Sequence, residues 1–330
     1  MSDAAGHREL VRIMRAVEIA GPSEVFFAGA KVALPEDAPT PIVAGLQAHF
    51  YQHCYCRRLD EAAGKADSTP ADAIGADAFL AALAAANAGE DRWSAGWRIS
   101  DILSSGQIIA GKAALSRLAW PGEFVSHAGP GIPAPIGALI SLFAPRGSSV
   151  AQPGFYIAFG EALTDWHDQQ DVVRFYWNVR ASGAAMLMRE LTRTLNRFGL
   201  AFQFKCLSHP AGYPRADAAV LYVARRHYRV TAQVLTELWP ALEGTLMPSV
   251  PLFAKELAAG LGLAEDPGSG ESFGMHRCRL LAEAVWRAHG AGGMDRMEAL
   301  GDVFRDNGLT LSRPYLNPGS DDDYPFPVAS

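Results

Sequence analysis

Polar and apolar residues alternate strictly along residues 172–180, and this pattern predicts a β-strand with two different faces. The apolar face carries Val173, Phe175, Trp177 and Val179. The polar face carries Arg174, Tyr176, Asn178 and Arg180. A polar face of this kind faces either water or a ligand, and the segments that follow decide where it lies.

An amphipathic helix is predicted at residues 183–198, ending at Gly199, followed by strands at 201–207 and 218–223. A strand–helix–strand unit favours two parallel strands in one sheet, joined by a right-handed crossover. The helix covers the apolar face. The opposite face then gathers the polar side chains of both strands: Arg174, Tyr176, Asn178, Gln203 and Lys205.

The remaining periodicity predicts helices at residues 9–20, 41–58, 71–87, 230–242, 272–288 and 294–306, with a loop at 63–70. Short strands are expected from residues 93–100 to about residue 141. Together these elements predict an α+β fold with an α/β-like core, in which helices flank a mixed sheet. We expect two parts: a helical region at 1–90 that docks a peptide or partner, and an α+β catalytic domain at 91–330.

Charge is distributed unevenly along the chain. Residues 174–229 hold ten Lys/Arg residues and two acids, a local charge of +8 in a chain of net charge −6. Such separation is typical of anion binding, and we interpret the block as a phosphate site. The pI of about 5.9 and the lack of a docking motif argue against nucleic acid. Four scattered cysteines, no signal pattern and no membrane-length apolar run predict a cytoplasmic protein without a metal site.

Lys205 is the candidate general base. It lies between Phe204 and Cys206 in a segment with no other charge. A lysine amine that is partly desolvated among cations loses its proton more readily, whereas an arginine does not deprotonate. The alternative is a lysine that is solvated or paired with a carboxylate.

Other residues of the second half supply candidate ligands. Four arginines are expected to bind phosphate through their planar forks: Arg174, Arg215, Arg277 and Arg313. Tyr176 and His209 are candidate proton donors, and Asn178, Gln203 and Ser272 are candidate substrate contacts. The alternatives are a polar strand face in water, a loop histidine held by backbone groups, and an ordinary capped helix starting after Ser272.

Several motifs resemble the HopA-type family, which is named after a bacterial type III secretion effector. They are Arg174-Phe175-Tyr176-Trp177-Asn178, Phe202-Gln203-Phe204-Lys205, Arg215-x-Asp217, Val220-Leu221-Tyr222 and Glu271-Ser272-Phe273-Gly274-x-x-Arg277, with Trp93-x-x-Gly96-Trp97 and Tyr156-x-x-Phe159-Gly160-Glu161 upstream. The resemblance spans about residues 75–320.

Family members in class V lanthipeptide and thioamitide pathways resemble phosphothreonine/phosphoserine lyases. The resemblance therefore implies a phosphothreonine-lyase-like fold and elimination of phosphate from phosphorylated Ser or Thr of a precursor peptide. The partner it implies is an aminoglycoside-phosphotransferase-like kinase, and no cofactor is needed. Lys205 matches the base lysine of phosphothreonine lyases. Arg174 and Tyr176 stand where those lyases have Lys and His, so the general acid is open: Tyr176, His209, or none if the ionised phosphate leaves unaided.

Two other readings are open at this point. The chain is then either a non-catalytic partner that binds a peptide or scaffolds a Ser/Thr kinase, or a secreted effector that acts on host phosphoproteins. Lys205 distinguishes the lyase from the scaffold, because only the lyase needs a base at that position.

Overall fold

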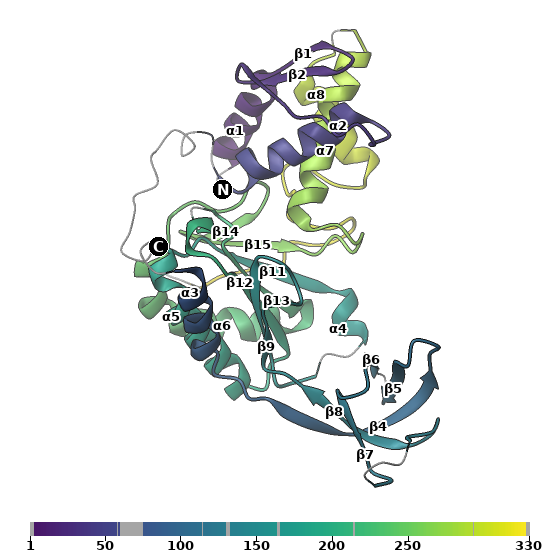
Figure 1. Ribbon diagram of the computed structural model, residues 1–330. Coiled ribbons are helices and arrows are strands. Elements are labelled where there is room, and N and C mark those ends of the chain that lie inside the picture. Colours follow the sequence, from purple (N-terminus) through teal and green to yellow (C-terminus); the bar gives the residue numbers. More distant parts are fainter. Residues whose placement is uncertain are drawn as a thin grey trace.

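A computed structural model describes residues 3–57, 59, 75–113, 115–129, 133–163, 166–213, 215–292 and 294–327. It confirms the α+β class. Figure 1 shows three parts in a row: a helical lobe, a central sheet with helices on one side, and an outer sheet at the far end. The predicted loop at 63–70 lies outside the described residues.

The central sheet has seven strands in the order β14-β15-β11-β13-β12-β10-β9. Their bounds are β9 Gly147–Ser148, β10 Phe155–Phe159, β11 Val172–Trp177, β12 Phe202–Leu207, β13 Ala219–Ala224, β14 Lys255–Ala258 and β15 Leu261–Glu265. The strands predicted at 172–180, 201–207 and 218–223 are therefore present. They end within about three residues of the predicted limits.

Every neighbouring pair in this sheet is antiparallel, so the expectation of a mixed sheet with a parallel pair is wrong. β11 and β12 do run in the same direction, but β13 lies between them and is antiparallel to both. The loop between β12 and β13 is short enough for the two strands to form a hairpin. β13 therefore takes the place beside β11 that β12 was expected to fill.

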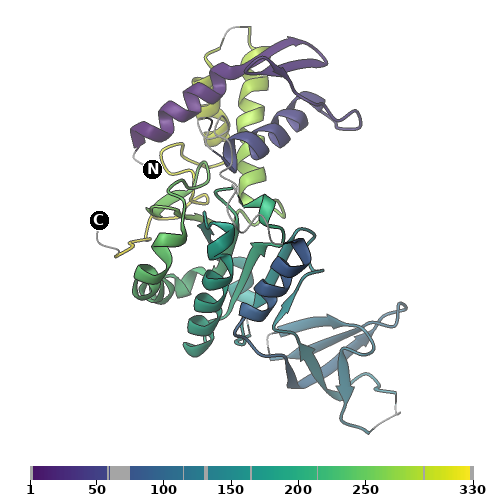
Figure 2. The same ribbon diagram turned by 60° about the vertical axis from the view of Figure 1, so that its left-hand side comes forward.

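Helices α3 Ala76–Ala86, α5 Ala181–Arg197 and α6 Tyr228–Leu242 pack on one face of this sheet (Figures 1 and 2). Leu187, Leu191 and Leu195 of α5 share a hydrophobic core with Phe175 and Phe204 of the strands. As predicted, α5 ends before Gly199, whose positive φ of 62° suits a residue without a side chain. Short helices connect these elements: α4 Trp166–Gln170 and the 3₁₀ turns Pro210–Gly212, Arg225–His227 and Glu243–Thr245.

The helical lobe is built from one segment near the N-terminus and one that follows the central sheet. It contains α1 Asp3–Ala16, β1 Val17–Gly21, β2 Glu24–Phe27, β3 Ala30–Lys31, α2 Pro41–Phe50, a π-helical turn Tyr51–Tyr55, α7 Phe273–Gly290 and α8 Arg296–Asp306. The first helix stops at Ala16, because the residues predicted to continue it pair as a β-hairpin. The hydrophobic core of this lobe includes residues from both chain ends, while α3 belongs to the core of the central sheet. The boundary expected at residue 90 therefore does not separate these two hydrophobic cores.

Two half-buried histidines are expected to make this lobe acid-sensitive. Burial, aided by the neighbouring His53, lowers the pKa of His49 from 6.5 to about 4. Burial, aided by Arg277 and Arg279, lowers the pKa of His276 from 6.5 to about 4 as well. Below pH 6.5 the unfolded chain binds protons more readily than the folded chain does. The free energy of unfolding therefore has its full value above pH 6.5 and falls as the pH drops toward 4. We expect the midpoint of urea unfolding to fall across this window, less steeply in a variant with both histidines changed to Gln. Equal slopes would contradict this.

The outer sheet has the order β6-β5-β4-β8-β7 and a small core of its own. Its strands are β4 Arg92–Ile102, β5 Ile108–Lys112, β6 Leu115–Ala119, β7 Phe124–Ser126 and β8 Leu139–Ala144, which agree with the run of short strands predicted from residue 93. Trp97 and Ile140 lie in the core, whereas Trp93 and Phe143 form an exposed aromatic pair with ring centres 5.3 Å apart.

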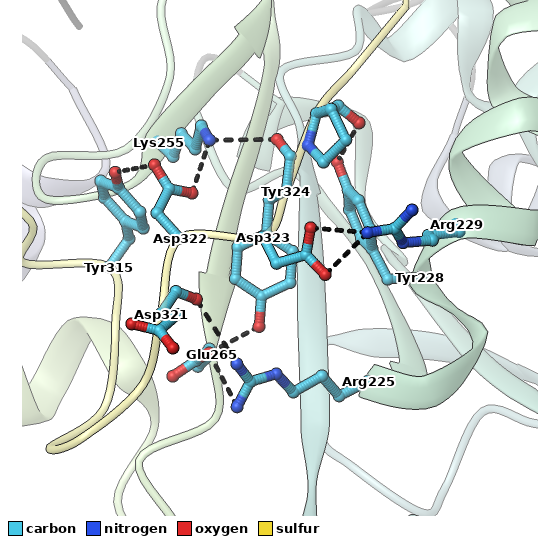
Figure 3. A network of polar contacts seen from close by, with 11 residues as sticks. Arg225, Tyr228, Arg229, Lys255, Glu265, Tyr315, Asp321, Asp322, Asp323 and Tyr324 are labelled. Carbon is cyan, nitrogen blue, oxygen red and sulfur yellow. Dashed lines mark hydrogen bonds and ion pairs between the residues drawn. The ribbon is translucent and has the colours of Figure 1, made fainter.

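The C-terminal tail crosses the helix-covered side of the central sheet and is held there by polar contacts (Figure 3). Lys255 Nζ donates to Asp322 Oδ1 at 2.6 Å, and the buried Tyr324 donates its hydroxyl to Glu265 Oε1 at 2.5 Å. Arg229 forms an exposed pair with Asp323. The tail thus fastens β14 and β15 to the start of α6.

Removal of residues 321–330 is expected to destabilise the protein by about 3 kcal/mol, because a buried tyrosine and the partner of a buried carboxylate are lost. Thermal unfolding measures this as a lower Tm. Asp323→Asn is the control: its pair with Arg229 is solvent-exposed, so the Tm should not change. A truncated chain with the Tm of the full chain would show that the tail contributes nothing.

Candidate functional site

Three adjacent strands bring the polar positions of the second sheet face into two rows. In the strand register the first row holds Arg174, Tyr222 and Gln203, and the second holds Tyr176, Val220 and Lys205. Directly paired residues point to the same face of a sheet, so these side chains are neighbours. The predicted gathering of Arg174, Tyr176, Gln203 and Lys205 on one face is therefore observed, with Tyr222 at its centre.

Lys205 is half-buried in the middle of β12. Its Nζ lies 4.6 Å from the ring centre of Phe155 and 5.4 Å from that of Tyr222, and it donates to Gln152 Oε1 at 3.3 Å. No carboxylate among the described residues forms an ion pair with this amine. The aromatic faces stabilise a cation only weakly, so the site lacks the fixed counterion of a structural lysine.

Arg174 lies diagonally across the same ring, with its guanidinium carbon 5.3 Å from the centre of Tyr222. It is only 8% exposed, because β11 is an inner strand between β15 and β13. Nε donates to Asp266 Oδ2 at 2.8 Å, and Nη2 contacts the same oxygen. Asp266 therefore fixes the orientation of Arg174 next to Tyr222 and offsets part of its charge.

Tyr176 is buried between the sheet and the helical lobe, and it is only 3% exposed. Its ring meets Tyr55 edge-on at 6.4 Å, and its hydroxyl has no partner at hydrogen-bonding distance among the described residues. Burial raises the pKa of Tyr176 to about 12, against the opposing effect of Arg174. The phenol is thus protonated but screened from solvent, which is a poor position for delivering a proton to a substrate.

Arg215 lies in the β12–β13 loop and is already paired. Nε and Nη2 donate to the two carboxylate oxygens of Asp217, each at 2.8 Å, and Nη2 also donates to the Tyr51 hydroxyl at 3.2 Å. Burial, with Asp217 adding to it, raises the pKa of Tyr51 above its ordinary range. This cluster fastens the loop to the helical lobe. It leaves Arg215 apart from the group around Tyr222.

Three further predicted residues have structural partners instead of a shared cavity. Arg277 is 1% exposed, and it donates to Pro314 O at 2.7 Å and Leu316 O at 3.0 Å. Asn178 donates its amide to the Ser249 carbonyl at 2.9 Å and to its hydroxyl at 2.8 Å. Ser272 caps α7 by accepting the Met275 N–H, as the capped-helix alternative stated.

The last predicted residues are exposed. His209 Nδ1 accepts the backbone N–H of Ala211 at 3.1 Å, which matches the alternative of a loop histidine held by backbone groups. Arg313 lies in the segment after α8 and is exposed. Gln203 is exposed beside Tyr222, and it is the one predicted substrate contact that shares a sheet face with both Lys205, on the same strand, and Arg174, on the far side of Tyr222.

Sequence reasoning missed the residues that complete the group: Tyr222, Asp266, Phe155 and Gln152. Tyr222 could have been found, since Val220 and Tyr222 alternate with apolar residues in the predicted third strand. Asp266 could not, because glycines interrupt the apolar run of β15 and hide the strand that places it. Phe155 and Gln152 come from a neighbouring strand and the turn before it.

A cavity of about 650 Å³ lies between the central and outer sheets and borders this group. Gln203, Tyr222 and Asp266 line its inner end, and these residues contact or adjoin Lys205 and Arg174. None of the predicted cations lines it, neither Lys205 and Arg174 nor Arg215, Arg277 and Arg313. The structure brings Lys205 and Arg174 together at the Tyr222 ring, which does line the cavity.

Two other kinds of feature are absent from the described part of the chain. No helix there is long and apolar enough to cross a membrane. No group of three or more His, Cys, Asp or Glu side chains in the same residues is arranged to hold a metal ion.

Comparison with solved structures finds similarity to two bacterial effectors. One, an effector protein from Pseudomonas syringae pv. tomato strain DC3000, aligns over 96% of this chain and 98% of its own with a TM-score of 0.52 and 15% identity. The other, an effector protein from Pseudomonas syringae pv. syringae strain 61, aligns over 83% of this chain and 89% of its own, with a TM-score of 0.46 and 15% identity. At this identity the first alignment shows a shared fold and nothing more.

Sequence comparison gives the family. None of the curated proteins matches the chain. The model of the HopA1 effector protein family matches residues 147–316, which include the central sheet from β9 to β15 and most of the candidate site. That match covers more than half of the residues, so this chain belongs to the HopA1 effector protein family.

Proposed function

We propose that this protein is a lyase that eliminates phosphate from phosphorylated Ser or Thr of a peptide, with Lys205 as the general base. The observation that carries the proposal is the position of the Lys205 amine. It is half-buried, faces the Phe155 ring and the Tyr222 ring that Arg174 also contacts, and has no carboxylate partner among the described residues. An unpaired amine next to a fixed cation suits an anionic substrate that also gives up a proton.

The reaction needs one proton transfer and one departing group. The neutral amine of Lys205 takes the α-proton, the electrons of that C–H bond form the Cα–Cβ double bond, and phosphate leaves Cβ with the electrons of the C–O bond. The products are dehydroalanine from phosphoserine or dehydrobutyrine from phosphothreonine, free phosphate, and a protonated lysine that returns its proton to solvent. Base catalysis of this kind typically contributes about 10²–10⁴-fold.

Arg174 is the phosphate ligand in this proposal. Its guanidinium is oriented by Asp266 and lies across Tyr222 from Lys205, so it can stabilise the charge that grows on phosphate as the bond breaks. Arg215 and Arg277 are left out of the phosphate set because their guanidinium groups lie over the Tyr51 and Phe273 rings and not over the Tyr222 ring that Lys205 contacts. The buried position of Tyr176 favours departure of an ionised phosphate without an acid.

The substrate class proposed is a ribosomally made precursor peptide phosphorylated in the cytoplasm by an aminoglycoside-phosphotransferase-like kinase that acts with this lyase. The proposal comes from the family motifs around Arg174 and Lys205. A second candidate is a secreted effector that removes phosphate from host phosphoproteins, which the name of the matching family favours. Both use the same chemistry and differ in substrate.

Incubation of the purified protein with synthetic phosphothreonine and phosphoserine peptides, without kinase, tests the reaction. Mass spectrometry should show loss of phosphoric acid, and an added thiol should attach to the new double bond. Peptides that stay phosphorylated at high enzyme concentration would reject the lyase in favour of a non-catalytic peptide-binding or kinase-scaffolding role. Turnover of folded phosphoproteins faster than of short peptides would favour the effector candidate.

Arg174→Gln is expected to lower kcat/KM for phosphate elimination by about 10²–10³-fold, because the fixed cation at the leaving group is lost. Asp266→Asn should be added, since Asp266 would otherwise lose its partner. Arg229→Gln is the control, because that arginine pairs only with the exposed Asp323. Unchanged kinetics in the Arg174→Gln, Asp266→Asn variant would remove Arg174 from the site.

A further inference from the structure

The cavity between the two sheets has the features of a binding cleft for an extended chain. Its volume of about 650 Å³ lies within the range of about 300–1,000 Å³ that is usual for ligand sites. Gln203, Tyr222 and Asp266 line it, and the last two contact Lys205 and Arg174, which themselves stand behind the lining.

One wall of the cleft is a free strand edge. β6 pairs with β5 on one side and with no other strand among the described residues. Arg117, Leu118 and Ala119 of β6 all line the cavity, although side chains of successive strand residues point to opposite faces. The strand therefore borders the cavity with its edge, where unpaired backbone groups are available to another extended chain.

The rest of the lining combines apolar and aromatic groups with polar residues such as Arg92, Glu123 and Gln169. Phe143 of β8 is 41% exposed and Leu118 is 54% exposed, and both line the cavity with the rings of Phe159 and Phe202. Exposed apolar groups gathered at one cavity are unusual for a surface with no partner. Of the carboxylates that also line it, Asp168 pairs with Arg226 and Asp266 with Arg174, and Glu123 accepts the backbone N–H of Trp120.

We propose that this cleft binds the peptide segment next to the phosphorylated residue as an extended strand along β6, with apolar side chains against Leu118 and Phe143. This inference rests on the proposed lyase function and adds how a peptide substrate is recognised. Main-chain hydrogen bonds to a strand edge tolerate many sequences, and apolar pockets for alternate side chains give the preference. The protein would then favour apolar residues flanking the phosphorylated Ser or Thr.

The test compares two substrates in matched variants. The long probe is a fluorescein-labelled peptide of about ten residues, about two strand lengths, with valines around a central phosphothreonine. The short probe is N-acetyl-phosphothreonine N-methylamide, which is too small to reach Leu118 or Phe143. Phe143→Asp and Leu118→Asp place a charge in the cleft. Leu139→Asp is the control. Leu139 lies on the same strand, β8, four residues before Phe143; it is 44% exposed and does not line the cavity.

Each cleft variant is expected to raise KM for the long probe at least tenfold while kcat for the short probe stays unchanged, because a charge replaces an apolar side chain that the bound peptide would cover. The control should match the wild type with both probes, and thermal unfolding checks that all three variants fold. An unchanged KM for the long probe, or an equal rise in the control, would overturn the cleft while the lyase function stands.

A binding measurement separates the two proposals. Fluorescence anisotropy with the unphosphorylated long peptide needs no turnover. Binding that is at least tenfold weaker in Phe143→Asp than in Leu139→Asp supports the cleft even if no variant eliminates phosphate. Equal binding by both variants overturns the cleft whatever the activity assay shows.

Discussion

Lys205→Arg is expected to lower the rate of phosphate elimination by about 10²–10⁴-fold while the protein folds normally. Arginine keeps the positive charge and the contact with the rings of Phe155 and Tyr222, but it does not deprotonate. The change therefore removes the base and leaves the charge. Phosphate release from a phosphothreonine peptide under single-turnover conditions measures the effect on the chemical step.

Two further variants show what the lysine contributes. Lys205→Ala should be as slow as Lys205→Arg if the amine acts as the base. If the arginine variant instead keeps its rate and only the alanine variant is slow, the residue provides charge and the base lies elsewhere. Lys31→Arg is the control, since that lysine is exposed and pairs with Glu24.

Arg277→Met is expected to destabilise the protein by about 3 kcal/mol or more, because two buried carbonyl groups would lose their donor. Those carbonyls belong to Pro314 and Leu316, in the segment that leads into the C-terminal tail. Burial lowers the pKa of Arg277 to about 10, so the side chain stays charged, and it also lies over the Phe273 ring at 4.9 Å. Urea unfolding at neutral pH measures the loss.

The same helix provides the comparison for Arg277. Arg279 pairs with Glu271 and Glu283 at the surface, so Arg279→Ala should cost less than about 1 kcal/mol. A phosphate-binding role for Arg277 would give the opposite result. The methionine variant would then unfold like the wild type and bind phosphopeptide poorly.

Local periodicity was sufficient to predict most elements of the second half of the chain. The alternation in β11 and the apolar stripe of α5 correctly separated Phe175 and Phe204 from Arg174 and Lys205. Periodicity did not show that β13 inserts between β11 and β12, because strand order depends on how the loops close and not on any one strand. It also missed β15, and with it Asp266.

The basic block shows the limit of reasoning from charge along the sequence. Six of its ten cations form ion pairs in the described structure: Arg174, Arg193, Arg215, Arg225, Arg226 and Arg229. Four of the partners lie far away in the sequence, such as Asp266, which is 92 residues from Arg174. Half of the local excess of +8 is therefore neutralised by the four carboxylates that folding brings from outside the block, instead of being kept for an anion.

The sequence by itself determined which side chains share a face, because the two-residue period of a strand and the 3.6-residue period of a helix are local properties. It also gave the family motifs around Arg174 and Lys205. Only the tertiary structure decided which cations keep a free charge, since the carboxylates that pair with Arg174 and Arg225 and the carbonyls that bind Arg277 come from segments distant in the chain. Lys205 differs from these arginines because folding brings Phe155, Tyr222 and Gln152 to its amine and no described carboxylate.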